Sequence, residues 1–227
     1  MGAFLVPCTL HMDIKYLGHS SFSIRTKNAK IVTDPFDPEY ISLPFAKTEA
    51  DIITISHDHK DHNHTENVKG DPLVLNWPGE FEKNQVRITG FATFHDKKEG
   101  EERGENVMYK FEADEISLLH CGDLGHVIDD ALIEQIGVVD VIFIPVGGVY
   151  TIDPAEAVKV INKIEPSVVI PMHYGRDELK GEAGQAMQKL EVFLKEIGAS
   201  DVQPVDKFTP KREEMDAENM KVVTLIG

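Results

Sequence analysis

Three histidines and two aspartates lie within six consecutive positions, residues 57–62, whose sequence is His-Asp-His-Lys-Asp-His. Removing so many polar and ionisable side chains from water costs free energy unless they bind something. A single histidine would have an ordinary explanation as a packed core residue, but three together favour a shared ligand. Imidazole nitrogens and carboxylate oxygens bind divalent metals. The stretch therefore predicts a metal site, with a solvated His/Asp loop of adventitious metal affinity as the alternative.

The elements around this stretch determine which side chains converge. The apolar run at residues 52–55 predicts a β-strand that ends at Ser56. If the backbone stays extended, His57 and His59 point to one side, because alternate residues of a strand share a face. The chain then begins to turn, so that either Asp61 or His62 can reach past the first metal to a second one. The spacing favours a two-metal centre.

Three further candidate ligands stand where other predicted strands end. They are His95, Asp123 and His173, which follow the β-rich runs at 92–94, 116–121 and 167–171. The two carboxylate oxygens of Asp123 can serve different metals, so we expect Asp123 to bridge two cations. Taken alone, His95 would be interpreted as a hydrogen-bonded sheet residue. The nearby Cys121 is interpreted as a packing residue rather than a ligand.

The pattern H-x-H-x-D-H after an apolar strand resembles the metal-binding signature of the metallo-β-lactamase-fold hydrolases. Other segments resemble the remaining motifs of that family, in the expected order: Thr33-Asp34-Pro35, Thr93-Phe94-His95-Asp96, Gly122-Asp123 and Pro171-Met172-His173-Tyr174. Four segments are similar to the branch related to the ascorbate-phosphate lactonases: residues 18–22 (GHSSF), 78–80 (PGE), 122–126 (GDLGH) and 145–148 (PVGG). The resemblance extends from about residue 13 to residue 174.

This resemblance implies an α/β fold, the four-layer αββα sandwich of the metallo-β-lactamase type, with a binuclear metal centre. One metal would be held by His57, His59 and His95, the other by Asp61, His62 and His173, and both by Asp123. The resemblance also implies that Asp34 orients the metal loop by hydrogen bonding, as residues behind metal ligands commonly do. An Asx turn before Pro35 is the alternative for Asp34.

Nitrogen and oxygen ligands without a thiolate suit two zinc ions, and manganese or iron would also accept them. Two cations about 3.5–4 Å apart can hold a hydroxide between them and lower the pKa of water from about 15.7 towards 7. We therefore expect hydrolysis by a metal-bridging hydroxide. Asp61 is predicted to orient this hydroxide and to shuttle a proton to the leaving group.

Other polar residues are candidates for the substrate pocket. His19, on a predicted hairpin turn, is expected either to act on the substrate or in proton transfer, or to lie on the surface. Arg103 and Asn106 belong to a charged segment that is either a solvated loop or a binding site for an anionic substrate group. Tyr150 and Tyr174 offer hydroxyl groups, although a tyrosine near a strand end is commonly structural.

The charge balance limits the classes of substrate that this protein could bind. The chain has 23 basic and 39 acidic residues and a net charge of −16, which repels nucleic acid unless a local basic patch outweighs it. About 50 residues separate Asp123 from His173, too few for the extra domain that the resembled RNA-processing enzymes insert there. We expect a small ester, lactone or phosphodiester as substrate. The alternatives are a nuclease, which would need a basic groove beside the site, and a non-catalytic metal-binding regulatory module.

The 227 residues suggest one hydrolase domain at 13–227, preceded by an extension at 1–12 that is either non-native or an over-extended start. No apolar run spans a bilayer and no secretory signal is present, so we expect a cytoplasmic protein without a membrane partner. Both a monomer and a homo-oligomer are compatible with the sequence. Cys8 and Cys121 are expected to remain thiols. The pattern predicts separate strands at 85–88 and 92–95 and a turn at 78–79. It also predicts helices at 132–136, 153–164 and 182–197, the second with Asp153 as N-cap and Pro154 at the first helical position.

Overall fold

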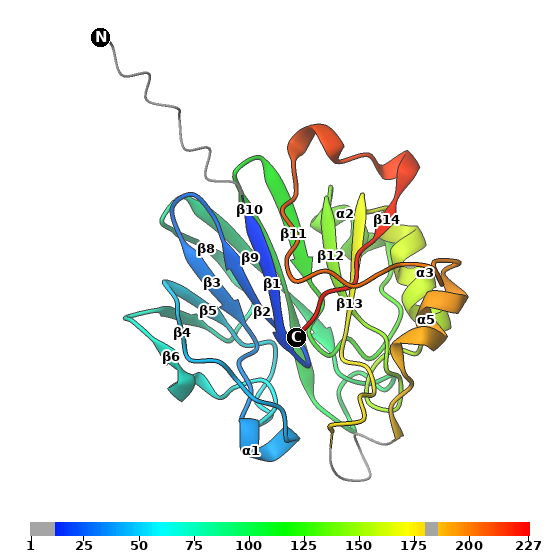
Figure 1. The fold of residues 1–227 in the computed structure, drawn as a ribbon, viewed down its shortest axis with the longest axis horizontal. Coiled ribbons are helices and arrows are strands. Elements are labelled where there is room, and N and C mark those ends of the chain that lie inside the picture. The colour runs from blue at the N-terminus through cyan, green and yellow to red at the C-terminus, as the bar shows by residue number, and fades with distance from the viewer. Residues whose placement is uncertain (1–11, 180–185) are drawn as a thin grey trace.

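The computed structural model of the chain describes residues 12–179 and 186–227, and its core consists of two β-sheets (Figure 1). The five-stranded sheet has the strand order β1 (Asp13–Gly18), β2 (Ser21–Arg25), β3 (Lys30–Thr33), β5 (Ile52–Thr54), β7 (Leu73–Leu75). The seven-stranded sheet has the strand order β14 (Lys221–Val222), β13 (Val168–Met172), β12 (Val141–Pro145), β11 (Ile116–His120), β10 (Glu105–Ala113), β9 (Val86–Phe94), β8 (Gly79–Lys83). A small third sheet pairs β4 (Thr48–Glu49) with β6 (Val68–Lys69).

The two large sheets pack face to face through apolar side chains. Phe22 of β2 stacks on Phe143 of β12 with ring centroids 4.2 Å apart, and both side chains are fully buried. Strands β11, β12 and β13 are buried along their whole length and run parallel to one another, as expected for strands covered on both faces. The largest apolar cluster therefore lies between the sheets and under the helices.

Helices cover part of the outer face of the seven-stranded sheet. They are α2 (Asp130–Ile136), α3 (Pro154–Ile164) and α5 (Leu190–Glu196), seen beside β12 to β14 in Figure 1. Helix α3 begins with a capping box, in which Asp153 Oδ1 accepts from Glu156 N at 2.8 Å and Glu156 Oε2 accepts from Asp153 N at 3.2 Å. Pro154 occupies its first turn, as the sequence predicted. The α/β class is confirmed.

The outer face of the five-stranded sheet is only partly covered. A second apolar cluster packs on it, formed by Val32 and Ile53 of the sheet together with Phe36, Leu43 and Phe45. Helix α1 (Pro38–Ile41) contributes Ile41 to this cluster. The short 3₁₀ turns at Thr65–Asn67, Arg212–Glu214 and Ala217–Asn219 lie in loops.

Two predictions of secondary structure are wrong. Residues 85–88 and 92–95 were expected as two strands, but β9 runs unbroken through Gly90. The absence of a side chain there has a packing reason, because a β-carbon on Gly90 would lie about 3.0 Å from the Tyr109 ring. Residues 78–79 were expected only as a turn, whereas Gly79 opens β8.

The predicted helix at 182–197 is also wrong in the part that the structure describes, because α5 begins only at Leu190 and ends at Glu196. The backbone before it bonds outside the helix: Gln188 N donates to Gly147 O at 2.8 Å, and Gly175 N donates to Gln188 O at 2.9 Å. Residues 182–185 lie outside the described residues, as do 1–11 of the predicted extension, whereas Met12 is buried in the core. Each helix within 12–179 and 186–227 is too short or too polar to cross a bilayer.

Candidate metal centre

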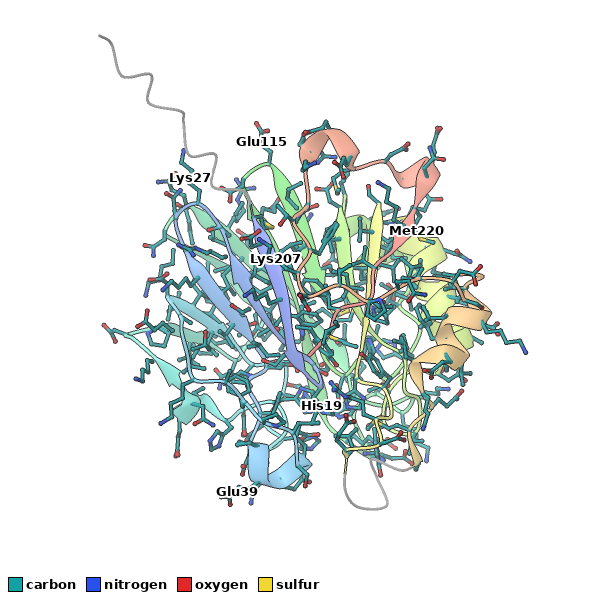
Figure 2. The ribbon with its side chains drawn as sticks, viewed as in Figure 1. His19, Lys27, Glu39, Glu115, Lys207 and Met220 are labelled. Carbon is teal, nitrogen blue, oxygen red and sulfur yellow. The ribbon has the colours of Figure 1, made fainter. Side chains whose placement is uncertain are left out.

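One edge of the two sheets gathers the loops that follow β1, β5, β9, β11 and β13, and His19 marks this edge in Figure 2. The loop after β5 supplies His57, His59, Asp61 and His62. His95, Asp123 and His173 follow β9, β11 and β13, respectively. The structure thus brings all seven predicted ligand residues to one place, although they are spread over more than 100 positions of the sequence.

Asp123 stands at the centre of this cluster. Its Oδ2 lies 3.1 Å from His173 Nε2, 3.3 Å from His62 Nε2 and 3.3 Å from His95 Nε2. The same oxygen lies 4.0 Å from His57 Nε2. Four imidazoles from three separate loops therefore surround one carboxylate.

The ligand atoms fall into two groups, in each of which all atoms lie within 4.8 Å of one another. The first group is His57, His59 and His95, and the second is His19, Asp61, His62 and His173. Asp123 groups with His57 and His62, one from each set. The division follows the one implied by the sequence, with His19 added to the second group.

The burial of these side chains fits a bound cation. Those of His57, His62, His95, His173 and Asp123 are 0–4 % exposed. Within the described residues, His57 Nε2, His62 Nε2 and Asp123 Oδ1 are buried without a hydrogen-bond partner. Each such atom costs about 1–3 kcal/mol if it stays unsatisfied. Imidazole nitrogen and carboxylate oxygen are donors that zinc and similar divalent metals accept, so the residues present fit such a metal.

Asp34 fixes the orientation and the tautomers of two histidines. Its Oδ1 accepts from Ser56 N at 2.7 Å, and its Oδ2 accepts from Ser56 Oγ at 2.6 Å and lies 2.8 Å from His62 Nδ1. Because the Ser56 hydroxyl gives its one proton to Asp34, it can only accept from His57 Nδ1, 2.9 Å away. Both imidazoles therefore carry Nδ1–H, so Nε2, which faces Asp123, is the atom through which each could bind a metal.

Asp123 is itself held by Asn106. The Asn106 Oδ1 accepts from Asp123 N at 2.9 Å, while its Nδ2 donates to Thr93 Oγ1 and to Cys121 O. Gly122 allows this contact, since it has φ +55° and a β-carbon there would overlap Asn106 Oδ1. The prediction that Asn106 binds substrate is wrong, because its amide is fully buried and bonded within the protein. Cys121 packs in the core, as predicted.

Burial and neighbouring charges set the protonation of the cluster. Burial, with the His62 charge, lowers the pKa of His57 to about 2, which keeps this imidazole neutral and free to bind a metal. Burial would also lower the pKa of His62, but Asp123 and Asp61 raise it well above its ordinary value. Burial would raise the pKa of Asp61, yet His62 and His19 hold it below its ordinary value. The carboxylates of Asp123 and Asp61 thus favour a positive charge at the centre of the cluster.

Direct hydrogen bonds join the two sheets at this edge. Val107 N of β10 donates to Ser56 O at 2.8 Å, and His173 N donates to His19 O at 2.9 Å. His120, at the end of β11, places its Nε2 2.8 Å from Ser20 O. These hydrogen bonds therefore fix the distance between the two sheets beside the cluster.

A cleft of about 690 Å³ opens over the cluster. Its walls include the apolar side chains of Ile41, Leu179 and Met187 and the phenol rings of Tyr40 and Tyr150. Lys60 and Arg103 supply positive charge. Of these, the sequence indicated only Arg103 and Tyr150. The walls come from loops whose composition carries no signal for a pocket.

Arg103 is held in a defined position. Its guanidinium carbon lies 4.3 Å from the centroid of the Tyr150 ring, a cation–π contact. Asp96 organises the loop before it, because its Oδ2 accepts from Glu102 N at 3.0 Å and from Arg103 N at 2.8 Å. The sequence placed Asp96 in a motif but did not reveal this role.

Of the remaining residues that the sequence singled out, only some line the cleft. His19 is 5 % exposed and lines the cleft, with Nε2 3.2 Å from Asp61 Oδ2, so the surface alternative is wrong. Tyr174 does not line the cleft, and its ring packs beside Tyr16 with centroids 6.3 Å apart. His126 accepts from Phe94 N at 3.4 Å, next to His95 but outside the cluster.

Comparison with known proteins identifies the family. Residues 13–173 match the family described as "Beta-lactamase superfamily domain". A UPF0173 metal-dependent hydrolase of Methanopyrus kandleri is 29% identical over 228 residues, which cover 83% of this chain and 99% of the relative. A UPF0173 metal-dependent hydrolase of Thermococcus onnurineus is 30% identical over 191 residues, which cover 72% of this chain and 84% of the relative.

Comparison with solved structures supports the same family. A protein of Thermotoga maritima, described as a Zn-dependent hydrolase of the metallo-β-lactamase superfamily, has 36% sequence identity and a TM-score of 0.78, covering 96% of this chain and 100% of that one. A metal-dependent hydrolase of Parabacteroides distasonis, with 19% identity and a TM-score of 0.64 over 94% and 92% of the two chains, shares the fold. The predicted sandwich of the metallo-β-lactamase type is confirmed. The chain therefore belongs to the β-lactamase superfamily, in the group of UPF0173 metal-dependent hydrolases.

Proposed function

We propose that this protein is a binuclear metal-dependent hydrolase whose substrate is a small ester, lactone or phosphodiester. One observation carries the proposal: two groups of ligand atoms, most of them buried, meet at Asp123, and several of those atoms have no partner among the described residues. The first group, with His57, His59 and His95, would hold one metal. Asp61, His62 and His173 would hold the other, and Asp123 would serve both.

Zinc suits this donor set, with manganese or iron as alternatives. Two bound cations would ionise a water at neutral pH and polarise the scissile group of the substrate. The protein positions the ligands for this chemistry through Asp34 and Ser56, which hold the Nε2 atoms of His57 and His62 towards Asp123.

Asp61 and His19 are the groups placed to move a proton. The Asp61 side chain is 23 % exposed, more than those of the buried ligands, and it lines the cleft where a leaving group would sit. Because Asp61 is ionised, the Nε2–H of His19 donates to its Oδ2. This bond holds Asp61 Oδ2 in place, so that the carboxylate can take a proton from water and pass it to the leaving group.

The cleft supports a small substrate with an acidic group. Arg103, stacked on Tyr150, offers a guanidinium that can bind a carboxylate or phosphate with two hydrogen bonds. Ile41, Leu179 and Met187 would contact an apolar part of the same molecule.

Elemental analysis of the purified protein and two variants tests the metal centre. We expect about two metals in the native protein, loss of the first in His57→Ala and loss of both in Asp123→Ala, each with loss of hydrolysis across a panel of esters, lactones and phosphodiesters. His64→Ala is the matched control, since His64 lies in the same segment but outside both groups. Unchanged metal content in Asp123→Ala would contradict the proposal.

A further inference from the structure

A basic groove of about 720 Å³ lies on the five-stranded sheet and shares no lining residue with the catalytic cleft. Six cationic side chains line it: Lys15, Arg25, Lys30, Lys47, Lys69 and Lys207. Only three carboxylates do so: Asp13, Glu49 and Asp206. In the whole chain the balance is the reverse, with 39 acidic and 23 basic residues. The groove thus concentrates positive charge on a strongly acidic protein.

The sheet itself builds this groove. The second apolar cluster, with Phe36, Leu43 and Phe45, covers only part of the outer face. Lys15 and Arg25 are exposed, whereas the residues that alternate with them in β1 and β2 are buried, so these two cations point away from the core. Lys207 lies beside β1 in Figure 2, well away from His19 at the catalytic edge. Asp13 opens β1 and His19 follows it, a separation of about 20 Å along an extended chain.

Two of the six cations are neutralised within the groove. Lys30 Nζ lies 3.0 Å from Glu49 Oε2, and Lys207 Nζ lies 3.1 Å from Asp13 Oδ1. Among the described residues, the other four have no carboxylate oxygen within 4.0 Å: Lys15, Arg25, Lys47 and Lys69.

The strand register adds to this excess. Arg25 of β2 stands directly opposite Asp13 of β1 on one side and Lys30 of β3 on the other. The Asp13 carboxylate already pairs with Lys207, and like charges opposite one another destabilise a sheet. An anion bound in the groove would offset this repulsion.

We propose that the groove binds a small molecule carrying two phosphate groups, such as a sugar bisphosphate. Six cations and three carboxylates leave the groove with a net charge of +3. A phosphate monoester carries about −1.5 to −2 charges at pH 7, so two of them carry about −3 to −4 and match this excess. The volume lies within the ~300–1,000 Å³ of small-molecule sites. Single-stranded RNA is a poorer match, because its bases stack on aromatic side chains and the groove residues include none.

Calorimetric titration of the metal-loaded protein with fructose 1,6-bisphosphate tests the proposal. We expect saturable binding at one site, weakened about tenfold by Lys15→Gln and about tenfold by Lys69→Gln, as for loss of one charge-assisted hydrogen bond. Inorganic phosphate should bind about 100-fold more weakly, because it engages half of the cations. Lys159→Gln is the matched control, since this exposed lysine lies on α3, and it should change the affinity less than about twofold.

Backbone amide spectra of the native protein locate the site independently of any variant. Bisphosphate should shift the amides of β1, β2 and β3 and leave those of residues 57–62 unchanged. Three results would each overturn the proposal: no saturable binding, equal affinity in native protein and the Lys15→Gln/Lys69→Gln double variant, or tighter binding of a 12-nucleotide RNA than of the bisphosphate.

Discussion

The hydrogen bonds of Asp34 lead to a specific expectation for Asp34→Asn, which keeps the size of the side chain and replaces one acceptor by a donor. The native carboxylate accepts three hydrogen bonds, two from Ser56 and one from His62. If the new amide nitrogen takes the place of Oδ1, it faces Ser56 N, and two donors meet at 2.7 Å. If it takes the place of Oδ2, it donates to His62 Nδ1, and the His62 proton must move to Nε2.

Either orientation weakens the metal centre. In the second one, His62 Nε2 no longer has a lone pair to offer, and in the first the Ser56 backbone is displaced next to His57. Loss of a residue that orients a metal ligand typically lowers metal affinity about 10–100-fold, which corresponds to about 1.4–2.8 kcal/mol. Loss of a buried hydrogen bond to a charged acceptor should also lower the free energy of unfolding by about 1.5–3 kcal/mol.

The assay is competition for zinc with a chromophoric chelator, combined with urea unfolding of the metal-free protein. Asp140→Asn is the matched control, because Asp140 is also buried and its Oδ2 accepts from Ser117 N at 2.8 Å and from Ser117 Oγ at 3.0 Å. We expect both variants to lose stability and only Asp34→Asn to lose zinc affinity. Native zinc affinity in Asp34→Asn, or an equal loss in Asp140→Asn, would refute the tautomer argument.

Three other substitutions have distinct expected outcomes. Arg103→Leu should raise KM about tenfold for an ester that bears a carboxylate and leave KM for a neutral ester unchanged, and equal effects on both in steady-state kinetics would contradict its role. Gly122→Ala should lower the free energy of unfolding and the metal content, because the β-carbon overlaps Asn106 Oδ1, whereas Gly104→Ala, with φ +89° and open space around it, should lose only the ~1–2 kcal/mol of backbone strain. Cys121→Ser should cost about 1–3 kcal/mol in denaturant unfolding through its buried hydroxyl, and a fall in metal content would show that Cys121 does more than pack.

The ligand cluster could be predicted because each ligand follows a strand, and strand ends of neighbouring strands meet at one sheet edge. In the sequence, His57 and His95 each lie at the end of a β-rich run. The start of α3 could also be predicted, because Asp153 is a residue type that commonly caps a helix N-terminus. The resemblance to the ascorbate-phosphate lactonase branch stays a prediction.

What failed depends on contacts between distant segments. Asn106 is a polar residue in a charged segment, and only the packing of β10 against β9 and β11 shows that its amide is buried. The break before α5 arises because Gln188 bonds to Gly147, a partner that no local pattern indicates. Ser56 immediately precedes His57, so the sequence could have indicated a role for it beside the ligands. That its hydroxyl donates to Asp34 and accepts from His57 follows only from the structure, which brings Asp34 beside it.

The hydrogen bonds that join the sheets at Ser56, His19 and Ser20 have a consequence for how an ion would arrive. In a zinc finger the chain folds around the metal, so that binding and folding are one event. Here hydrogen bonds within the chain join the backbone on both sides of the cluster, so we expect metal loading to need little rearrangement of the strands. The loaded and metal-free forms would then share one backbone.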